Sequence, residues 1–147
     1  MKSYEIRVLR LNESPEAPTM TTPRDAIGYW DCVITKMPWF IPDREICVVI
    51  TVNTRLRVTG HSLVSIGTLN ESIVHPREVF RPALVLNAYG VLLAHCHPSG
   101  DPTPSEADHR LTRRISEAAG ILQITLLDHV IVGRSPASYS FKEAGVL

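Results

Sequence analysis

Residues 90–108 read GVLLAHCHPSGDPTPSEAD, and this stretch decides the fold. The apolar run at 90–94 predicts a short buried strand that leads directly into His95-Cys96-His97. The PSGD sequence that follows is typical of a turn. The next residues are arranged as a helix cap, a first helical residue and a capping-box partner, which are Thr103, Pro104 and Glu106. We therefore expect a strand, a turn and a helix in succession.

The predicted helix has an unusual inward face. Residues at steps of three and four share one face of a helix, and here this face contains Ser105, Asp108, Leu111, Ile115, Ala118 and Leu122. Two polar residues therefore begin a stripe that is otherwise apolar. A buried carboxylate without a partner is costly, so Asp108 needs an explanation.

Outward from this unit, hydrophobic patterning predicts the other elements. We expect strands at residues 4–11, 46–52, 57–59, 63–66, 121–127 and 129–133. We expect helices to begin at Thr22 and His75, the second with a kink or an early break at Pro82. The run at 46–52 is apolar throughout, which indicates a central strand buried on both faces. Alternating strands and helices predict a single α/β (α+β) domain over residues 1–147, in which 1–20 form an N-terminal strand and loop.

Composition narrows the function classes. The 147 residues are enough for one domain with one sizeable core. Fifteen Lys and Arg balance fifteen Asp and Glu, so the chain lacks the overall positive charge of a dedicated nucleic-acid binder, although a local patch stays open. Three scattered cysteines predict no disulfide framework, and the N-terminal residues do not resemble a signal peptide. The longest apolar stretch, Ala83 to Ala94, is too short to span a bilayer. We expect a soluble cytoplasmic protein.

The chemistry-bearing residues are His95, His97 and Asp108. Alternate residues of a strand share a face and lie about 6.6 Å apart, so the two imidazoles can turn toward one ion while Cys96 points away. Asp108 reaches the same place from the start of the next helix. Two imidazoles and one carboxylate are typical of catalytic zinc, which keeps its fourth position for water. Cys96 and His109 are badly placed to complete a closed structural site.

Each of these residues also has an ordinary interpretation. A single histidine after an apolar strand is usually a hydrogen-bonded core or edge residue, and an aspartate near a helix start is usually a surface group favoured by the helix dipole. The combination of two histidines with an inward Ser105 and Asp108 favours the metal site over either separate interpretation.

The string HCHPSGDPTPSEAD fits the pattern H-x-H-x7-S-x2-D, and it resembles the JAMM motif of the JAB/MPN metalloproteases, most closely their RadC-type branch. The similarity extends from about Glu45 to Phe141 and includes HPSG at 97–100 and LDH at 127–129. It departs from the family at Cys96, where RadC-type proteins usually have Asn, and at Pro82. The resemblance implies a JAB/MPN, cytidine-deaminase-like fold with a mixed sheet flanked by helices.

The resemblance also implies roles for individual residues. His95, His97 and Asp108 correspond to the zinc ligands, and Ser105 to a serine that forms hydrogen bonds in the site and supports an oxyanion. Glu45 corresponds to the upstream glutamate that passes a proton from water to the leaving amine. The residues alone do not select Glu45, because Asp43, Glu71 and Glu78 are equal candidates.

Other reactive residues have weaker patterns. Cys47 or Cys96 would need a neighbouring base and an orienting group to act as a nucleophile, and Cys47 lies in an apolar strand where an inert thiol is the usual case. His129 either orients a metal ligand or packs as an ordinary strand histidine. His61 and His75 have no spacing that recruits them.

Three functions stay open at this stage. The first is a zinc-dependent metallopeptidase or isopeptidase that acts on an extended protein or peptide tail. The second, implied by the DNA-repair label of RadC-type proteins, is nucleic-acid processing, which the imidazole-rich motif and the neutral charge disfavour. The third is a non-catalytic MPN scaffold, although such members typically lose motif residues that this chain keeps.

Overall fold

The computed structural model describes residues 17–67 and 74–147. In this part of the chain, five strands form one sheet in the order β2-β1-β3-β4-β5. β1 (Ile46–Val52) pairs antiparallel with β2 (Val58–Ile66) and with β3 (Gly90–Cys96). β3 pairs parallel with β4 (Thr125–Val132), and β4 pairs antiparallel with β5 (Ser138–Ser140). This mixed sheet confirms the predicted α/β class.

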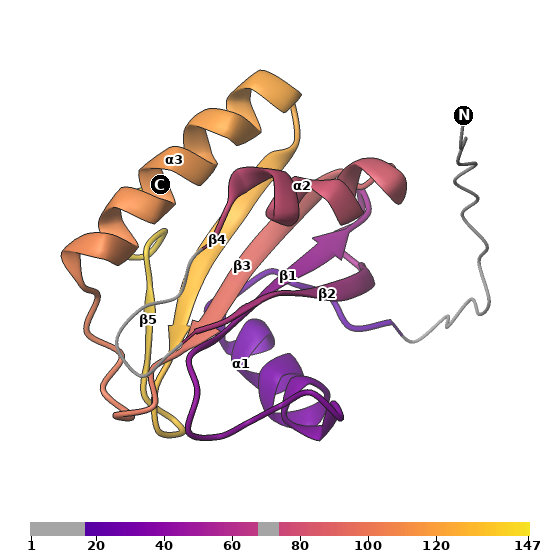
Figure 1. Ribbon diagram of the computed structural model, residues 1–147. Helices are drawn as coiled ribbons and strands as arrows, with labels where there is room; N and C mark the ends of the chain where they lie inside the picture. The colour runs from indigo at the N-terminus through magenta and orange to yellow at the C-terminus, as the bar shows by residue number, and fades with distance from the viewer. Residues whose placement is uncertain (1–16, 68–73) are drawn as a thin grey trace, which may run out of the picture.

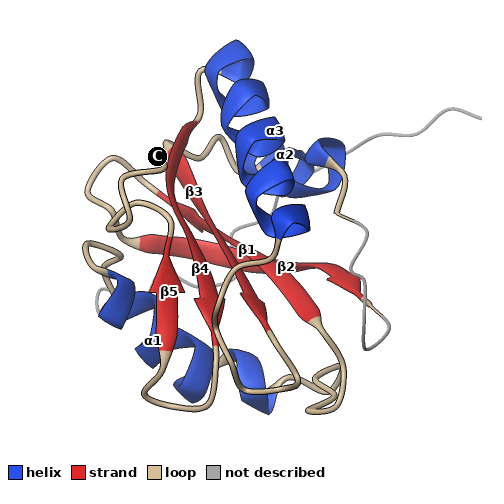
Figure 2. Cartoon of the chain, turned by 90° about the vertical axis from the view of Figure 1, so that its left-hand side faces the viewer, coloured by secondary structure: helices blue, strands red, loops and turns tan. Residues whose placement is uncertain are grey.

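Helices cover both faces of the sheet (Figure 1). α1 (Pro23–Cys32) and the short 3-10 helix η1 (Ile34–Lys36) lie on one face. α2 (Pro76–Val85) and α3 (Glu106–Leu122) lie on the other face, and Figure 2 shows the sheet between the two layers. α3 connects the parallel strands β3 and β4, so its N-terminus returns beside the end of β3.

Alternation along β3 divides the core into two clusters. Leu92 and Ala94 pack on the α1 side, whereas Val91 and Leu93 pack on the side of α2 and α3. His95 continues the second series, so its side chain points toward α3. β1 is buried at all of its positions, as expected for a strand covered on both faces.

Several predicted boundaries are wrong. The segments 57–59 and 63–66 belong to one strand, β2, because the intervening residues Gly60, His61 and Ser62 also pair with β1. The segments 121–127 and 129–133 are likewise replaced by a longer α3 and a single β4. Gly120 does not end α3. The helix continues to Leu122, and Gln123 caps it in the left-handed conformation.

Pro82 does not break α2, which continues to Val85. The proline removes one backbone hydrogen bond, while its neighbours Val79, Phe80 and Ala83 stay buried against the sheet. The predicted strand at residues 4–11 lies outside the described residues. None of the described helices is long and apolar enough to cross a bilayer.

Candidate metal centre

His95 and His97 lie at the end of β3, where the strand passes into a turn. His95 is the penultimate residue of β3 and is almost fully buried, whereas His97 follows the strand and is partly exposed. The turn closes through a hydrogen bond from Gly100 N to the His97 carbonyl. Gly100 has a φ of +80°, which favours glycine, and a Cβ there would lie 3.2 Å from Arg134 Cβ. The turn therefore holds His97 close to the sheet.

Asp108 reaches the same place through the N-terminal cap of α3. The cap residue is Ser105: its Oγ accepts from Asp108 N at 3.2 Å, and Asp108 Oδ2 accepts from Ser105 N at 2.7 Å. The prediction of Thr103 and Glu106 as the capping pair is wrong. Asp101 Oδ1 accepts hydrogen bonds from both Thr103 N and Thr103 Oγ1, so Thr103 belongs to the turn.

Three potential ligand groups meet at this point. His95 Nε2 and His97 Nε2 are 3.1 Å apart. Asp108 Oδ1 lies 3.2 Å from His95 Nε2, and Asp108 Oδ2 lies 3.5 Å from His97 Nε2. Tetrahedral zinc with bonds near 2.1 Å separates its ligand atoms by about 3.4 Å. This triad, His95, His97 and Asp108, is therefore able to bind a metal ion.

The hydrogen bonding of His97 also fits a metal. Its Nδ1 is 2.8 Å from the Asp101 carbonyl oxygen, which only accepts hydrogen bonds, so Nδ1 is the protonated nitrogen. The Nε2 lone pair then faces His95 and Asp108. A lone pair directed at a carboxylate is unfavourable unless a cation lies between them, so the donor set matches a bound ion.

The electrostatics of the triad favour positive charge. Burial alone would raise the pKa of the Asp108 carboxyl, but the close His95 and His97 imidazoles and the Ser105 hydroxyl hold that pKa well below its usual range. The adjacent Asp108 carboxylate raises the pKa of His97 against the opposing effect of burial. Asp108 therefore stays ionised at neutral pH, which is the state that binds a cation.

Glu45 lies immediately before β1, whose residue Cys47 pairs with His95. Burial raises the pKa of the Glu45 carboxyl, His95 and His97 oppose this shift, and the charge of Asp108 adds to it. Glu45 is thus electrostatically coupled to all three members of the triad. Of the other carboxylates considered, Asp43 is exposed in the loop before β1, Glu78 forms ion pairs with Arg77 and Arg81 on α2, and Glu71 lies outside the described residues.

A second layer of residues surrounds the triad. His129 Nε2 is 2.8 Å from His95 Nδ1, and His129 Nδ1 is 2.7 Å from Thr112 Oγ1. The structure therefore favours the ligand-orienting interpretation of His129. Thr112 was not predicted, since a single threonine within a helix has no sequence signal; only its spacing of four from Asp108 could have indicated it.

The remaining candidates form no part of the potential ligand group, although Cys47 and Cys96 are its neighbours. Cys96 points to the α1 side, where its Sγ donates to the Arg44 carbonyl. Burial raises the pKa of the Cys47 thiol, so this cysteine is a poor nucleophile. His109 packs edge-on against Phe141, and His61 Nδ1 is 2.8 Å from the Tyr29 hydroxyl.

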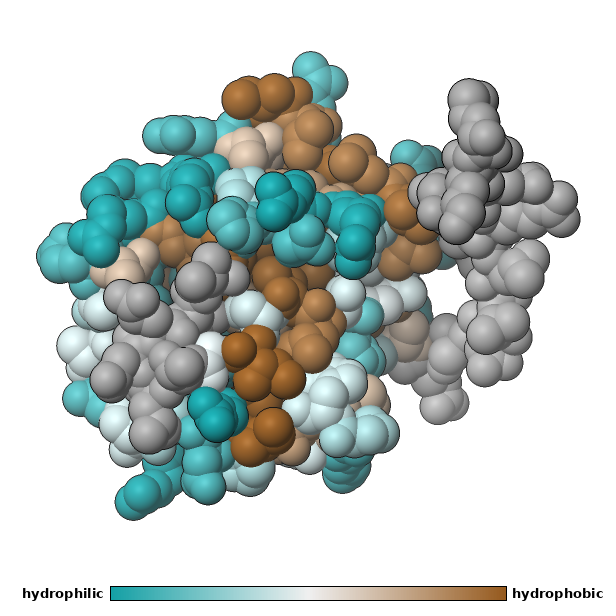
Figure 3. Space-filling model, viewed as in Figure 1, coloured by the Kyte–Doolittle hydropathy of each residue, from teal (hydrophilic) through white to brown (hydrophobic). Residues whose placement is uncertain are grey.

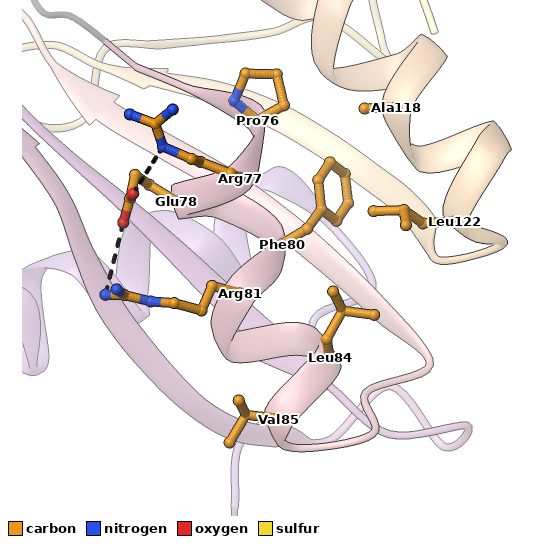
Figure 4. Close-up of a pocket in the computed structure, with 9 residues that line it drawn as sticks. All are labelled: Pro76, Arg77, Glu78, Phe80, Arg81, Leu84, Val85, Ala118 and Leu122. Atoms are coloured by element: carbon orange, nitrogen blue, oxygen red, sulfur yellow. Dashed lines mark hydrogen bonds and ion pairs between the residues drawn. The ribbon is translucent and has the colours of Figure 1, made fainter. Parts of the chain in front are cut away.

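A separate groove of about 640 Å³ lies between α2 and α3. Phe80, Leu84 and Leu122 line its apolar side, while Glu78 forms ion pairs with Arg77 and Arg81 along one wall (Figure 4). Hydrophobic surface also gathers near the C-terminal end of α3 and around α2 (Figure 3), where Leu84 and Ile121 are 57% and 83% exposed. No member of the triad lines this groove.

Comparison with known proteins assigns the family. Residues 20–146 match the model of the RadC-like JAB domain, and the chain belongs to this family. It is 43% identical over 141 residues to a UPF0758 protein of Rubrobacter xylanophilus, covering 96% of this chain and 59% of that protein. It is 49% identical over 105 residues to a UPF0758 protein of Thermotoga maritima, covering 71% of this chain and 47% of that protein.

A UPF0758 protein of Desulforudis audaxviator is 47% identical over 116 residues, covering 79% of this chain and 48% of that protein. The chain thus spans about half the length of the curated relatives it matches. Their names state no activity. Membership of the RadC-like JAB family, together with the triad, is compatible with a metallohydrolase.

Proposed function

We propose that this domain is a zinc-dependent metallopeptidase or isopeptidase that hydrolyses an amide bond in an extended protein or peptide tail. The observation that carries the proposal is the convergence of His95, His97 and Asp108, whose ligand atoms all lie within 4.8 Å of one another. The described residues contribute three ligands to this group and no fourth. Three ligands and an open position are typical of catalytic rather than structural zinc.

The chain's own residues then have distinct tasks. His95, His97 and Asp108 would hold zinc, which when bound polarises a substrate carbonyl and lowers the pKa of water to about 7. Glu45 would accept the proton of the attacking water at its carboxylate and donate it to the leaving amine. Ser105 holds Asp108 in place, since its Oγ donates to Asp108 Oδ2 at 2.7 Å. Its proposed support of an oxyanion requires this hydroxyl to turn toward the substrate.

The first test measures bound metal. We expect the purified protein to bind one equivalent of zinc and the His97→Ala variant to lose it, because two ligands do not retain the ion tightly. His75→Ala is the matched control, since His75 is exposed at the start of α2, away from the triad. Full zinc retention by His97→Ala would overturn the site assignment.

The second test separates metal binding from catalysis. Glu45→Gln should keep zinc but slow cleavage of a fusion-protein or peptide substrate by about 10²- to 10⁴-fold, because the amide cannot accept the proton. An unchanged rate would remove Glu45 from the mechanism. If the wild-type protein binds zinc but cleaves none of the fusion-protein or peptide substrates tested, this result would favour the non-catalytic scaffold. Salt-dependent binding of DNA would favour the nucleic-acid function.

A further inference from the structure

A chain of buried hydrogen bonds leads from the triad into the core. His95 Nδ1 is 2.8 Å from His129 Nε2, and His129 Nδ1 is 2.7 Å from Thr112 Oγ1. Thr112 Oγ1 is in turn 2.7 Å from the backbone carbonyl oxygen of Asp108. All of these side chains are buried, with Thr112 and His129 at 0% exposure. The chain therefore begins at one candidate ligand and ends on the backbone of another.

The last acceptor fixes the direction of every bond. A carbonyl oxygen only accepts, so Thr112 uses its one hydroxyl hydrogen on Asp108 and must accept from His129 Nδ1–H. Within the described residues, no carboxylate accepts a hydrogen bond from the buried His129 ring, so the ring is neutral. Because its one proton is on Nδ1, its Nε2 carries a lone pair. His95 Nδ1 must then be protonated and donate a hydrogen bond to His129 Nε2. The lone pair of His95 is left on Nε2, which faces Asp108.

We propose that Thr112 and His129 are positioning residues of the metal centre, which hold His95 in the tautomer whose Nε2 binds the ion. This inference rests on the zinc site of the proposed function. Neither residue belongs to the potential ligand group; their side chains reach it through His95, and Thr112 also binds the backbone carbonyl of Asp108.

The ring of His129 is itself held from two sides. Phe141 stacks on it with ring centroids 4.8 Å apart and an interplanar angle of 7°. The Asp128 carboxylate accepts from His129 N, and also from Ser140 Oγ and Lys142 N, which ties the segment around Phe141 to β4. These contacts restrict the ring plane, so the direction of its Nε2 toward His95 is set by packing as well as by Thr112.

His97 provides the internal contrast. The tautomer of His97 is fixed by one bond to the Asp101 carbonyl in the adjacent turn. The tautomer of His95 depends on two side chains, one from α3 and one from β4. A substitution that removes only the Thr112 hydroxyl should therefore disturb His95 and leave His97 unchanged.

The test compares three variants of the full chain. Thr112→Val removes the hydroxyl but keeps the shape, Thr112→Ser restores the hydroxyl, and Thr51→Val is the matched control. Thr51 is also a buried threonine with side-chain hydrogen bonds, to Thr59 and the Gly60 carbonyl, but it lies at the opposite end of β1 from Glu45. Zinc dissociation constants are measured by chelator competition, and the histidine tautomers of the zinc-free protein by nitrogen–proton NMR correlations.

We expect Thr112→Val to weaken zinc binding by roughly 10- to 100-fold, and Thr112→Ser and Thr51→Val to stay within about threefold of the wild-type protein. The NMR spectrum should show His95 protonated at Nδ1 in the wild-type and Ser proteins, and a mixture of tautomers in the Val protein. Wild-type zinc affinity together with an unchanged His95 tautomer in Thr112→Val would overturn the proposal.

The two readouts separate this proposal from the proposed function. If the wild-type protein binds no zinc, the metal-site assignment fails, whereas the NMR spectrum still decides whether Thr112 sets the His95 tautomer. Melting curves identify loss of folding; if Thr112→Val does not fold, Thr112→Ala removes the same hydroxyl with less crowding and is judged by the same criteria. An equal loss of zinc affinity in Thr51→Val would indicate a general structural effect and overturn the positioning role.

Discussion

Two helices of this domain begin with the same local structure, and only one of these helix starts belongs to the candidate site. In α1, Thr22 Oγ1 accepts from Asp25 N at 3.3 Å and Asp25 Oδ2 accepts from Thr22 N at 2.8 Å. In α3, Ser105 and Asp108 form the corresponding bonds at 3.2 and 2.7 Å. The hydrogen-bonding pattern of a capping box therefore does not distinguish a structural aspartate from a candidate ligand.

The surroundings of the two carboxylates make the difference. Asp25 lies near the surface, and its further partner is the neighbouring Thr21. Asp108 is 6% exposed and faces His95 and His97 at the end of β3. Its Oδ2 serves the cap while Oδ1 is directed at His95, so one carboxylate combines helix capping with a position beside two imidazoles. Tertiary placement, rather than the local motif, creates the candidate site.

The largest expected effect concerns zinc. Asp108→Ala should weaken zinc binding by more than about 100-fold, because it removes a proposed direct ligand, whereas loss of a residue that only orients a ligand costs about 10- to 100-fold. Asp25→Ala should bind zinc as the wild-type protein does, although it loses the equivalent cap. Isothermal titration of both variants with zinc measures this difference. Equal affinities would show that the two capping boxes do not differ in function.

An intermediate effect is expected from the cap residues. Thr22→Ala and Ser105→Ala should each lower the free energy of unfolding by about 1 kcal/mol, because each loses an N-cap acceptor. Ser105→Ala should in addition lower kcat/KM by roughly 10- to 100-fold, because Asp108 loses a positioning hydrogen bond. Urea unfolding and cleavage assays of the same preparations check both effects. Wild-type activity in Ser105→Ala would leave this serine with a capping role alone.

The smallest expected effect is the pH dependence of the stability that the capping box of α1, formed by Thr22 and Asp25, contributes. Burial raises the pKa of Asp25, but the hydrogen bonds from Thr21 and Thr22 together outweigh it, so its pKa in the folded protein lies below the unfolded value. The carboxylate therefore contributes stability above the unfolded pKa, and this contribution is lost as the pH falls through the folded pKa. Asp25→Asn should be less stable than wild type by about 0.5 kcal/mol at neutral pH.

The difference between these two proteins should disappear in acid, where Asp25 is protonated. Urea unfolding at neutral pH and again below the folded pKa of Asp25, which itself lies below the unfolded value of about 3.9, measures this change. A stability difference that persists unchanged in acid would contradict the assigned cause.

Local sequence determines much of this arrangement, which is why the triad could be predicted. His95, His97 and Asp108 are close in the chain, and strand and helix periodicity place them on facing surfaces. The capping pair was harder, because Thr103 and Ser105 both precede an acidic residue by three. Thr103 binds Asp101 in the preceding turn, which leaves Ser105 as the cap residue. The periodicity of apolar residues gives no information about this hydrogen bond.

Longer-range features could not be predicted from the residues. The roles of Thr112 and His129 depend on α3 and β4 packing together, and Glu45 depends on the pairing of β1 with β3. Glu45 was found through the family resemblance alone. The continuity of β2 across Gly60 also follows from pairing with β1 and not from its own composition.

The separation of Glu45 from the triad along the chain has a consequence for damaged or partly opened molecules. The three candidate ligands all come from the segment that joins β3 to α3. Glu45, the candidate proton carrier, is instead held near them by the pairing of β1 with β3. If the end of β1 separated from β3, the three candidate ligands could still hold an ion while Glu45 moved away from it. Metal content would then overestimate the fraction of molecules competent for turnover, so occupancy and competence must be counted independently.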